Sequence, residues 1–108
     1  MGKLTETLPE IDDKRDELVA VCRKFGVLRL DLFGSAADGS FDPRRSDLDF
    51  LVEFGPPRGT NAFHQFFGFQ FALEELFGRK IDLVDTTAMR NPYFIESVNR
   101  SRRPLYAA

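Results

Sequence analysis

The sequence predicts an α/β fold in which a small mixed β-sheet is flanked by helices. Stretches with an apolar residue at every second position, residues 27–33 and 48–54, alternate along the chain with stretches of helical spacing, and glycines follow the expected helices. Elements in this order pack as layers around a shared core. At 108 residues the chain has the length of one domain, so residues 1–108 are expected to form a single domain.

The first expected element is a helix from Pro9 or Asp12 to Phe25. Acidic residues lie in its first turn, basic residues lie in its last, and Gly26 suits its end. Cys22 falls at the spacing of the apolar residues of this helix, which predicts a core position. It is the single cysteine of the sequence, so an internal disulfide and a cysteine-rich zinc site are excluded.

The next stretch alternates cleanly and predicts a half-buried strand. Leu28, Leu30 and Leu32 are expected to face the core, whereas Arg29 and Asp31 face the opposite way. The same alternation predicts a second strand, with apolar residues at every second position from 48 to 54 on one side and acidic residues on the other.

The second half of the chain begins with an unusually aromatic helix. It is expected to start at Thr60 or Asn61, either of which can cap it, and to run to Phe77, where Gly78 closes it. The remaining expected elements are a strand over residues 80–84, a helix from Pro92 or Tyr93 to about Arg100, and a short edge strand over residues 103–106.

Charge and hydropathy argue against several classes of protein. The longest apolar runs span only a few residues, so no segment is expected to cross a membrane. Fifteen Lys and Arg against 17 Asp and Glu give a net charge of −2, which argues against a protein that coats nucleic acid by charge alone. The polar start of the sequence shows no signal-peptide pattern, and a cytoplasmic location is expected.

Two aspartates on the second strand are the first chemical signal. Asp47 and Asp49 project from one face of a strand, about 6.6 Å apart at ~3.3 Å per residue. Carboxylates held together in this way repel each other and suit Mg²⁺ or Mn²⁺. Asp82, on the next expected strand, can supply a third carboxylate. On spacing alone, a solvated strand face is the better explanation of the pair.

A glycine–serine pair upstream favours the chemical interpretation. Gly34 and Ser35 follow an apolar strand and lead into a segment of small residues. A glycine lets the backbone approach a phosphate, and exposed N–H groups with a serine hydroxyl can hold an anion. The combination of this pair, the two aspartates and the third acidic strand is much more specific than any one part.

At these residues the chain resembles the minimal nucleotidyltransferases of the DNA polymerase β-like superfamily. The resemblance rests on residues 32–35, 46–52 and 80–84, and on the ending from Pro92 to Tyr106. It extends from the first expected helix to the end of the sequence. It implies the nucleotidyltransferase fold.

The resemblance also implies a role for each residue of the site. Gly34 and Ser35 would hold the β- and γ-phosphates of a nucleoside triphosphate, and Asp47 and Asp49 would ligate two Mg²⁺ ions. Asp82 would ligate the metal ion nearest the incoming hydroxyl and help it lose its proton. The reaction would be an in-line attack on the α-phosphate of ATP with release of pyrophosphate.

Two departures from the family pattern predict a weakened activity. Ala36 and Asp38 stand where family members commonly carry arginines, and a carboxylate beside a triphosphate opposes binding. The linker between the glycine–serine pair and the first aspartate has eleven residues, one more than usual. Arg44 and Arg45, in this longer loop, are expected to take over nucleotide binding.

Six phenylalanines crowd the aromatic helix and cannot all lie on one stripe, at ~100° per residue. They are Phe63, Phe66, Phe67, Phe69, Phe71 and Phe77. They form either core with a little aromatic exposure, or a surface that faces a partner. His64, in the same helix, is expected to be structural. The basic residues Arg100, Arg102 and Arg103 form either a solvated end or a contact with a nucleotide or an acidic partner.

The sequence therefore supports two hypotheses of function. The first is a Mg²⁺-dependent enzyme that moves AMP from ATP to an acceptor hydroxyl, which the resemblance implies to be on a partner HEPN-domain toxin, so that this chain is the antitoxin. The second is a catalytically weakened subunit that neutralises or scaffolds a partner through its phenylalanine-rich helix. A second copy of the chain is the other candidate for that surface.

Overall fold

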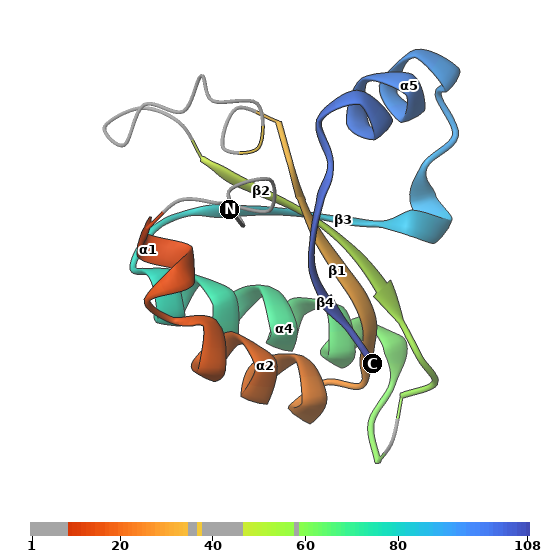
Figure 1. Cartoon of the computed structure of the whole chain (residues 1–108). Helices are drawn as coiled ribbons and strands as arrows, with labels where there is room; N and C mark the ends of the chain where they lie inside the picture. Colours follow the sequence, from red (N-terminus) through yellow and green to blue (C-terminus); the bar gives the residue numbers. More distant parts are fainter. Residues whose placement is uncertain (1–8, 35–36, 38–46, 58) are drawn as a thin grey trace.

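The computed structural model describes residues 9–34, 37, 47–57 and 59–108. Its centre is a four-stranded mixed sheet of order β3-β2-β1-β4 (Figure 1). The strands are β1 (Val27–Phe33), β2 (Leu48–Phe54), β3 (Ile81–Asp85) and β4 (Arg103–Ala107). β1 runs antiparallel to β2 and β4, whereas β2 and β3 are parallel. The predicted small mixed sheet with flanking helices is confirmed.

Helices lie on both sides of this sheet. They are α1 (Pro9–Asp12), α2 (Arg15–Lys24), α4 (Ala62–Phe77), the short 3₁₀ helix η2 (Thr86–Ala88) and α5 (Pro92–Ser101). α2 and α4 pack together against one face, and α5 lies on the other side, beyond the end of β1 (Figure 1). Among the described residues, no helix is both long and apolar enough to cross a membrane.

The main core fills the space between the sheet and the α2–α4 layer. Leu30 and Leu32 of β1 and Phe50 of β2 are fully buried against residues such as Leu18 and Phe69 from the two helices. Cys22 is also buried in this core, as predicted, and its burial raises the thiol pKa to about 12. The cysteine is therefore an inert core residue rather than a nucleophile.

A second, smaller core forms under α5. Phe33 of β1, Leu51 of β2 and Val98 of α5 are buried together, with Met89 packed at the edge. Leu51 is apolar on the face that otherwise carries aspartates because α5 covers that part of the sheet. This cluster fixes α5 against the ends of the central strands.

The prediction that Leu28 faces the core is wrong. Leu28 is 42% exposed, because a β-bulge interrupts the alternation of β1. Val27 pairs with Phe54 and Arg29 pairs with Glu53, so Leu28 is the extra residue between two pairs. After the bulge, residues 30–33 of β1 are all buried.

The prediction that Asp31 lies on a solvated strand face is also wrong. Asp31 is only 1% exposed. Its carboxylate accepts hydrogen bonds from Arg102, at the junction of α5 and β4, and from Arg29. A carboxylate can be buried here because these two guanidinium groups compensate its charge.

The first helix differs from the single element expected, since it is divided between α1 and α2. Lys14 has φ −114° and ψ 22°, outside the helical range, and its amide donates to the carbonyl of Ile11 in a tighter turn. Arg15 then turns back to Asp12, with 2.9 Å between Nη2 and Oδ1. The break leaves both Ile11 and Leu18 in the core.

The aromatic helix follows its expected bounds. Asn61 caps α4 by accepting from the amide of His64 at 2.9 Å, and Gly78 ends it in the left-handed conformation at φ +64°. Its phenylalanines include core residues and surface residues: Phe69 and Phe77 are buried, whereas three others are exposed. The exposed ones are Phe63, Phe67 and Phe71.

Candidate active site at the ends of the central strands

The candidate site lies where β1 ends and where β2 and β3 begin. Phe33, the last residue of β1, pairs with Asp49 of β2, and Asp49 in turn pairs with Asp82 of β3. Gly34 follows directly after Phe33. The sheet therefore sets Phe33, Asp49 and Asp82 in one row across three strands, with the predicted glycine directly after Phe33.

Gly34 lies directly against the Asp49 carboxylate. Its φ is +75°, in the left-handed region that favours glycine. A Cβ placed on Gly34 would lie 3.2 Å from Cγ of Asp49 and would overlap Oδ2. Only glycine fits at this position, because the backbone lies directly against the carboxylate of Asp49.

Asp49 is the electrostatic centre of the site. Its pKa is raised from 3.8 to about 6, first by burial, then by a hydrogen bond with Asp82, and then by the negative charges of Asp82 and Asp47. Each cause acts against the ionised form. The site therefore concentrates negative charge that a cation would stabilise.

Asp47 lies at the start of β2 and is less enclosed. Its Oδ2 lies 3.9 Å from Nζ of Lys80, and its side chain is 39% exposed. Within the described ranges, no three His, Cys, Asp or Glu side chains are arranged so that they could hold a metal ion. Asp47 is turned toward Lys80 and Asp49 toward Asp82, so the side chains would have to turn to share one ion.

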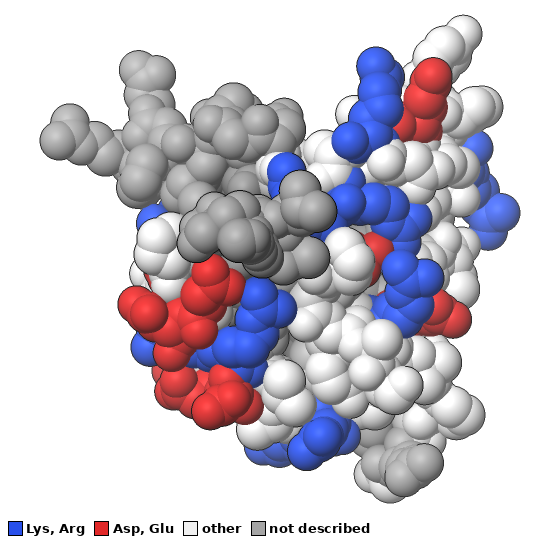
Figure 2. Space-filling view, viewed as in Figure 1, with Lys and Arg blue, Asp and Glu red and all other residues white. Residues whose placement is uncertain are grey.

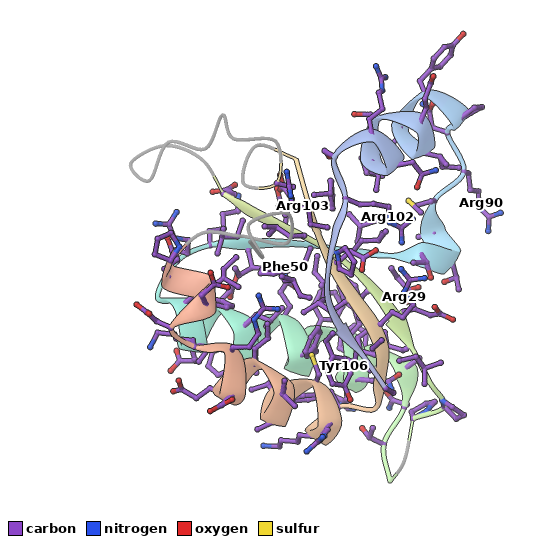
Figure 3. All side chains as sticks on the ribbon, viewed as in Figure 1. Arg29, Phe50, Arg90, Arg102, Arg103 and Tyr106 are labelled. Atoms are coloured by element: carbon purple, nitrogen blue, oxygen red, sulfur yellow. The ribbon has the colours of Figure 1, made fainter. Side chains whose placement is uncertain are left out.

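Three consecutive residues at the junction of α5 and β4 hold the end of β1 and the turn after it (Figure 3). Ser101 Oγ accepts from the amide of Gly34 at 3.1 Å. Arg103 Nε donates to the carbonyl oxygen of Ala37 at 2.7 Å. Arg102, labelled beside Arg103 in Figure 3, donates from Nε to Asp31 Oδ2 at 2.8 Å. We name this group the α5–β4 anchor.

Asp31 at the base of the anchor is incompletely satisfied. Oδ2 accepts a hydrogen bond from Nε of Arg102 and forms ion pairs with Nη2 of Arg102 and, at 3.4 Å, with Nη2 of Arg29. Oδ1 is buried and has no hydrogen-bond partner in the described part of the chain. Such a pair positions β4 more than it stabilises the fold, since charge burial offsets much of the attraction.

A pocket of about 340 Å³ opens beside Gly34. Ser97, Arg100 and Ser101 line its other side, all from α5. Arg100 is exposed. Figure 2 shows Lys and Arg side chains along this side of the molecule, over α5 and β4. The pocket therefore joins a backbone turn, two hydroxyls and a cation next to the aspartates.

Several predicted site residues lie outside the described residues. They are Ser35, Ala36, Asp38, Arg44 and Arg45. Their expected roles stay predictions. Of the other predicted residues, the structure brings Gly34, Asp49 and Asp82 together and sets Asp47 at the edge.

Two members of the anchor carry no sequence pattern that predicts this role. Ser101 belongs to no motif. For Arg103 the sequence predicts a solvated end or a contact with a nucleotide or an acidic partner, whereas its guanidinium donates to the protein's own backbone. The one sequence feature that points to the anchor is the run of a serine and two arginines at the end of the last helix.

A mixed sheet that sets two facing aspartates on parallel neighbours beside a glycine turn defines a class of phosphoryl-transfer protein. The chain belongs to the nucleotidyltransferase family, since the nucleotidyltransferase domain profile matches residues 17–105. The resemblance drawn from the sequence is thereby confirmed, and the chain is a nucleotidyltransferase.

Two relatives come from the archaeon Methanocaldococcus jannaschii. One, named "putative protein adenylyltransferase", is 35% identical over 94 residues, which cover 86% of this chain and 92% of the relative. A second relative of the same name is 33% identical over 75 residues, 69% of this chain and 73% of the relative.

Solved structures share the fold. A "putative minimal nucleotidyltransferase" superposes with a TM-score of 0.73 at 29% identity, covering 92% of this chain and 96% of the other. A toxin–antitoxin complex with AMP-PNP superposes with a TM-score of 0.65 at 20% identity, covering 87% of this chain and 73% of the other. A complex of a tri-AMPylated Shewanella oneidensis HEPN toxin with its MNT antitoxin gives 0.61 at 16% identity, over 90% and 72%.

Proposed function

We propose that this chain transfers AMP from ATP to a hydroxyl of a partner protein, in a Mg²⁺-dependent reaction. The observation that carries the proposal is the pairing of Asp49 with Asp82 on parallel strands, with Gly34 directly against the Asp49 carboxylate. Phosphoryl transfer needs positioning and charge compensation more than covalent chemistry, and this arrangement offers both.

The aspartates fit a divalent cation by their chemistry. Asp49 is partly buried against Asp82 and its pKa is raised to about 6, so the ionised pair is under-compensated in the protein alone. Asp47, Asp49 and Asp82 would hold two Mg²⁺ ions, with all-oxygen ligands of the kind Mg²⁺ prefers. Bound there, Mg²⁺ would supply charge compensation for the triphosphate and for the leaving pyrophosphate.

The remaining groups position the reactants. The backbone turn at Gly34 and the hydroxyl of Ser35 would hold the β- and γ-phosphates, with Arg44 and Arg45 adding positive charge. The acceptor oxygen attacks the α-phosphorus, the bond to the bridging oxygen of the β-phosphate breaks, and pyrophosphate leaves. Asp82, exposed at the mouth of the site, would take the proton of the hydroxyl.

The acceptor we propose is a HEPN-domain toxin, with this chain as its antitoxin. Two relatives are named putative protein adenylyltransferases, and one solved structure of the same fold is a tri-AMPylated HEPN toxin in complex with an MNT antitoxin. The exposed position of Asp82 suits an acceptor that arrives from outside, on another protein.

The test incubates the purified chain with Mg²⁺, ATP labelled at the α-phosphate, and a HEPN protein encoded beside it. Label should move to the HEPN protein and not to a HEPN variant that lacks acceptor hydroxyls. Asp49→Asn should abolish transfer. Asp85→Asn is a matched control, since Asp85 lies on the same strand as Asp82 and caps η2, a role that asparagine keeps. Transfer that persists in Asp49→Asn would show that the site is elsewhere.

A second candidate function is neutralisation by binding alone. The exposed Phe63, Phe67 and Phe71 favour it, because exposed aromatic side chains commonly anchor interfaces. In that case Asp49→Asn would still neutralise the toxin in cells, and no label would be transferred by the wild type.

A further inference from the structure

The outer face of α4 carries a stripe of exposed phenylalanines, on the side away from the sheet. Phe63, Phe67 and Phe71 are 65%, 50% and 63% exposed. They follow at intervals of four residues, so they share one side of the helix over about 12 Å. The rings of Phe63 and Phe67 are in contact, with centroids 4.7 Å apart. We name these three residues the phenylalanine stripe.

Opposite charges lie at the two ends of this stripe. Near its start, Arg23 and Lys24 of α2 and His64 of α4 line one pocket of about 300 Å³. At its other end, Glu74 and Glu75 lie in the last turn of α4. A surface that crosses the stripe from end to end therefore passes from basic to acidic.

The neighbouring helix α2 supplies the basic end of this separation and adds acidic residues at the other end. α2 runs antiparallel to α4: Phe25, after the end of α2, packs on Gly68 and Phe69. Acidic residues, Asp16 and Glu17, lie in the first turn of α2 and basic residues in its last. Figure 2 shows acidic side chains gathered over α1 and the start of α2, and basic side chains toward the end of α2. The layer formed by α2 and α4 is thus acidic where α2 begins and α4 ends, and basic where α2 ends.

We infer that the phenylalanine stripe packs against the same stripe of a second copy of this chain, with the two α4 helices antiparallel. A two-fold axis at Phe67 sets Phe63 of one copy against Phe71 of the other, and the reverse, as a self-complementary interface requires. The same axis places the basic end of each copy on the acidic end of the other. A parallel pairing would set like charges together.

The charge separation favours a second copy over a different protein. A partner with one predominant charge would be attracted at one end of the stripe and repelled at the other. A second copy, turned by 180°, matches both ends at once. The phenylalanines supply the apolar centre, and the charges at the two ends set the direction.

Sedimentation velocity of the purified wild-type chain, at high micromolar concentration and low salt, tests the inference. We expect a dimer, and Phe67→Ala should weaken it about thirtyfold, the change that 2 kcal/mol at an interface centre gives. Phe67→Glu should be a monomer with an unchanged circular dichroism spectrum. Tyr93→Glu, at a side chain 82% exposed on α5, is the matched control and should dimerise like the wild type.

Charge exchange tests the antiparallel direction. The double variant Arg23→Glu/Lys24→Glu has two acidic ends, and Glu74→Lys/Glu75→Lys has two basic ends. Each should dimerise more weakly than the wild type, whereas an equimolar mixture should form the mixed dimer and lose it in high salt. A wild type that is monomeric throughout, a dimer that survives Phe67→Glu, or a mixture no stronger than its components would each overturn the inference.

Discussion

Arg103 donates from Nε to the carbonyl oxygen of Ala37 at 2.7 Å, across 66 positions of sequence. Ala37 is itself joined to the site, since its amide donates to the carbonyl of Gly34 at 3.0 Å. One guanidinium of β4 therefore holds the turn that follows the glycine. A residue of β4 is in this way tied to the backbone that we propose to hold the phosphates.

Removal of this contact should weaken nucleotide binding. Arg103→Met keeps most of the apolar stem and loses one hydrogen bond to the backbone, which is worth about 1 kcal/mol. We expect Mg·ATP to bind about fivefold more weakly, by calorimetry. Arg90→Met, at an exposed arginine before α5 (Figure 3), should bind as the wild type does. Equal affinities of the two variants would show that the turn keeps its position without Arg103.

Gly34→Ala should destabilise the fold for two separable reasons. The alanine would have to adopt φ +75°, which disfavours any residue with a side chain, and its Cβ would overlap the Asp49 carboxylate. Gly78→Ala shares the first cost, at φ +64°, but meets nothing within 4 Å. Urea unfolding should therefore show a loss of about 1 kcal/mol for Gly78→Ala and about 1–3 kcal/mol more for Gly34→Ala. Equal losses would mean that the Asp49 side chain turns away freely.

Asp49 should make the stability of the protein alone depend on pH. Because the pKa of Asp49 is about 6 when folded against 3.8 ordinarily, its protonated form favours folding below about pH 4, and this contribution is lost as the pH rises through 6. Asp49→Asn removes the change. The variant should match the wild type near pH 4 and exceed it near pH 7 by about 1 kcal/mol, a value reduced for solvent screening. Asp13→Asn, in the exposed turn before α2, should keep the wild-type pH profile.

The pair of Asp31 and Arg102 should show the asymmetry of a buried charge. Arg102→Met leaves a carboxylate in an apolar site, with Arg29 as its remaining cation, and should lower the free energy of unfolding by about 2–3 kcal/mol. The double variant Asp31→Leu/Arg102→Met removes both charges and should recover most of this loss, because Oδ1 of Asp31 had no partner among the described residues. Guanidinium unfolding of the three proteins measures both effects. A double variant no more stable than Arg102→Met would show that the pair stabilises the fold directly.

Local alternation in the sequence was enough to predict that Asp49 and Asp82 lie on strands that can share a site, but not the register that sets them side by side. Asp49 and Asp82 each lie in a short stretch with a clear period of two, and parallel pairing then set them side by side. The burial of Asp31 could not be predicted in this way, because its partner Arg102 lies 71 residues later. The prediction for Leu28 failed for another reason. The alternation of the sequence continues through Leu28, and the bulge arises only from the pairing of β1 with β2.

The contacts of the α5–β4 anchor join residues 66 to 71 positions apart, and this has a consequence for the order of folding. Loops of this length are slow to close, so the anchor is expected to dock after the β1–β2 hairpin and the two helices beneath it have formed. On the ribosome, α5 and β4 also emerge after every strand that carries an aspartate of the site. The nascent chain would thus hold its acids in place before its glycine turn is fixed, and the proposed triphosphate site would be complete only in a late step of folding.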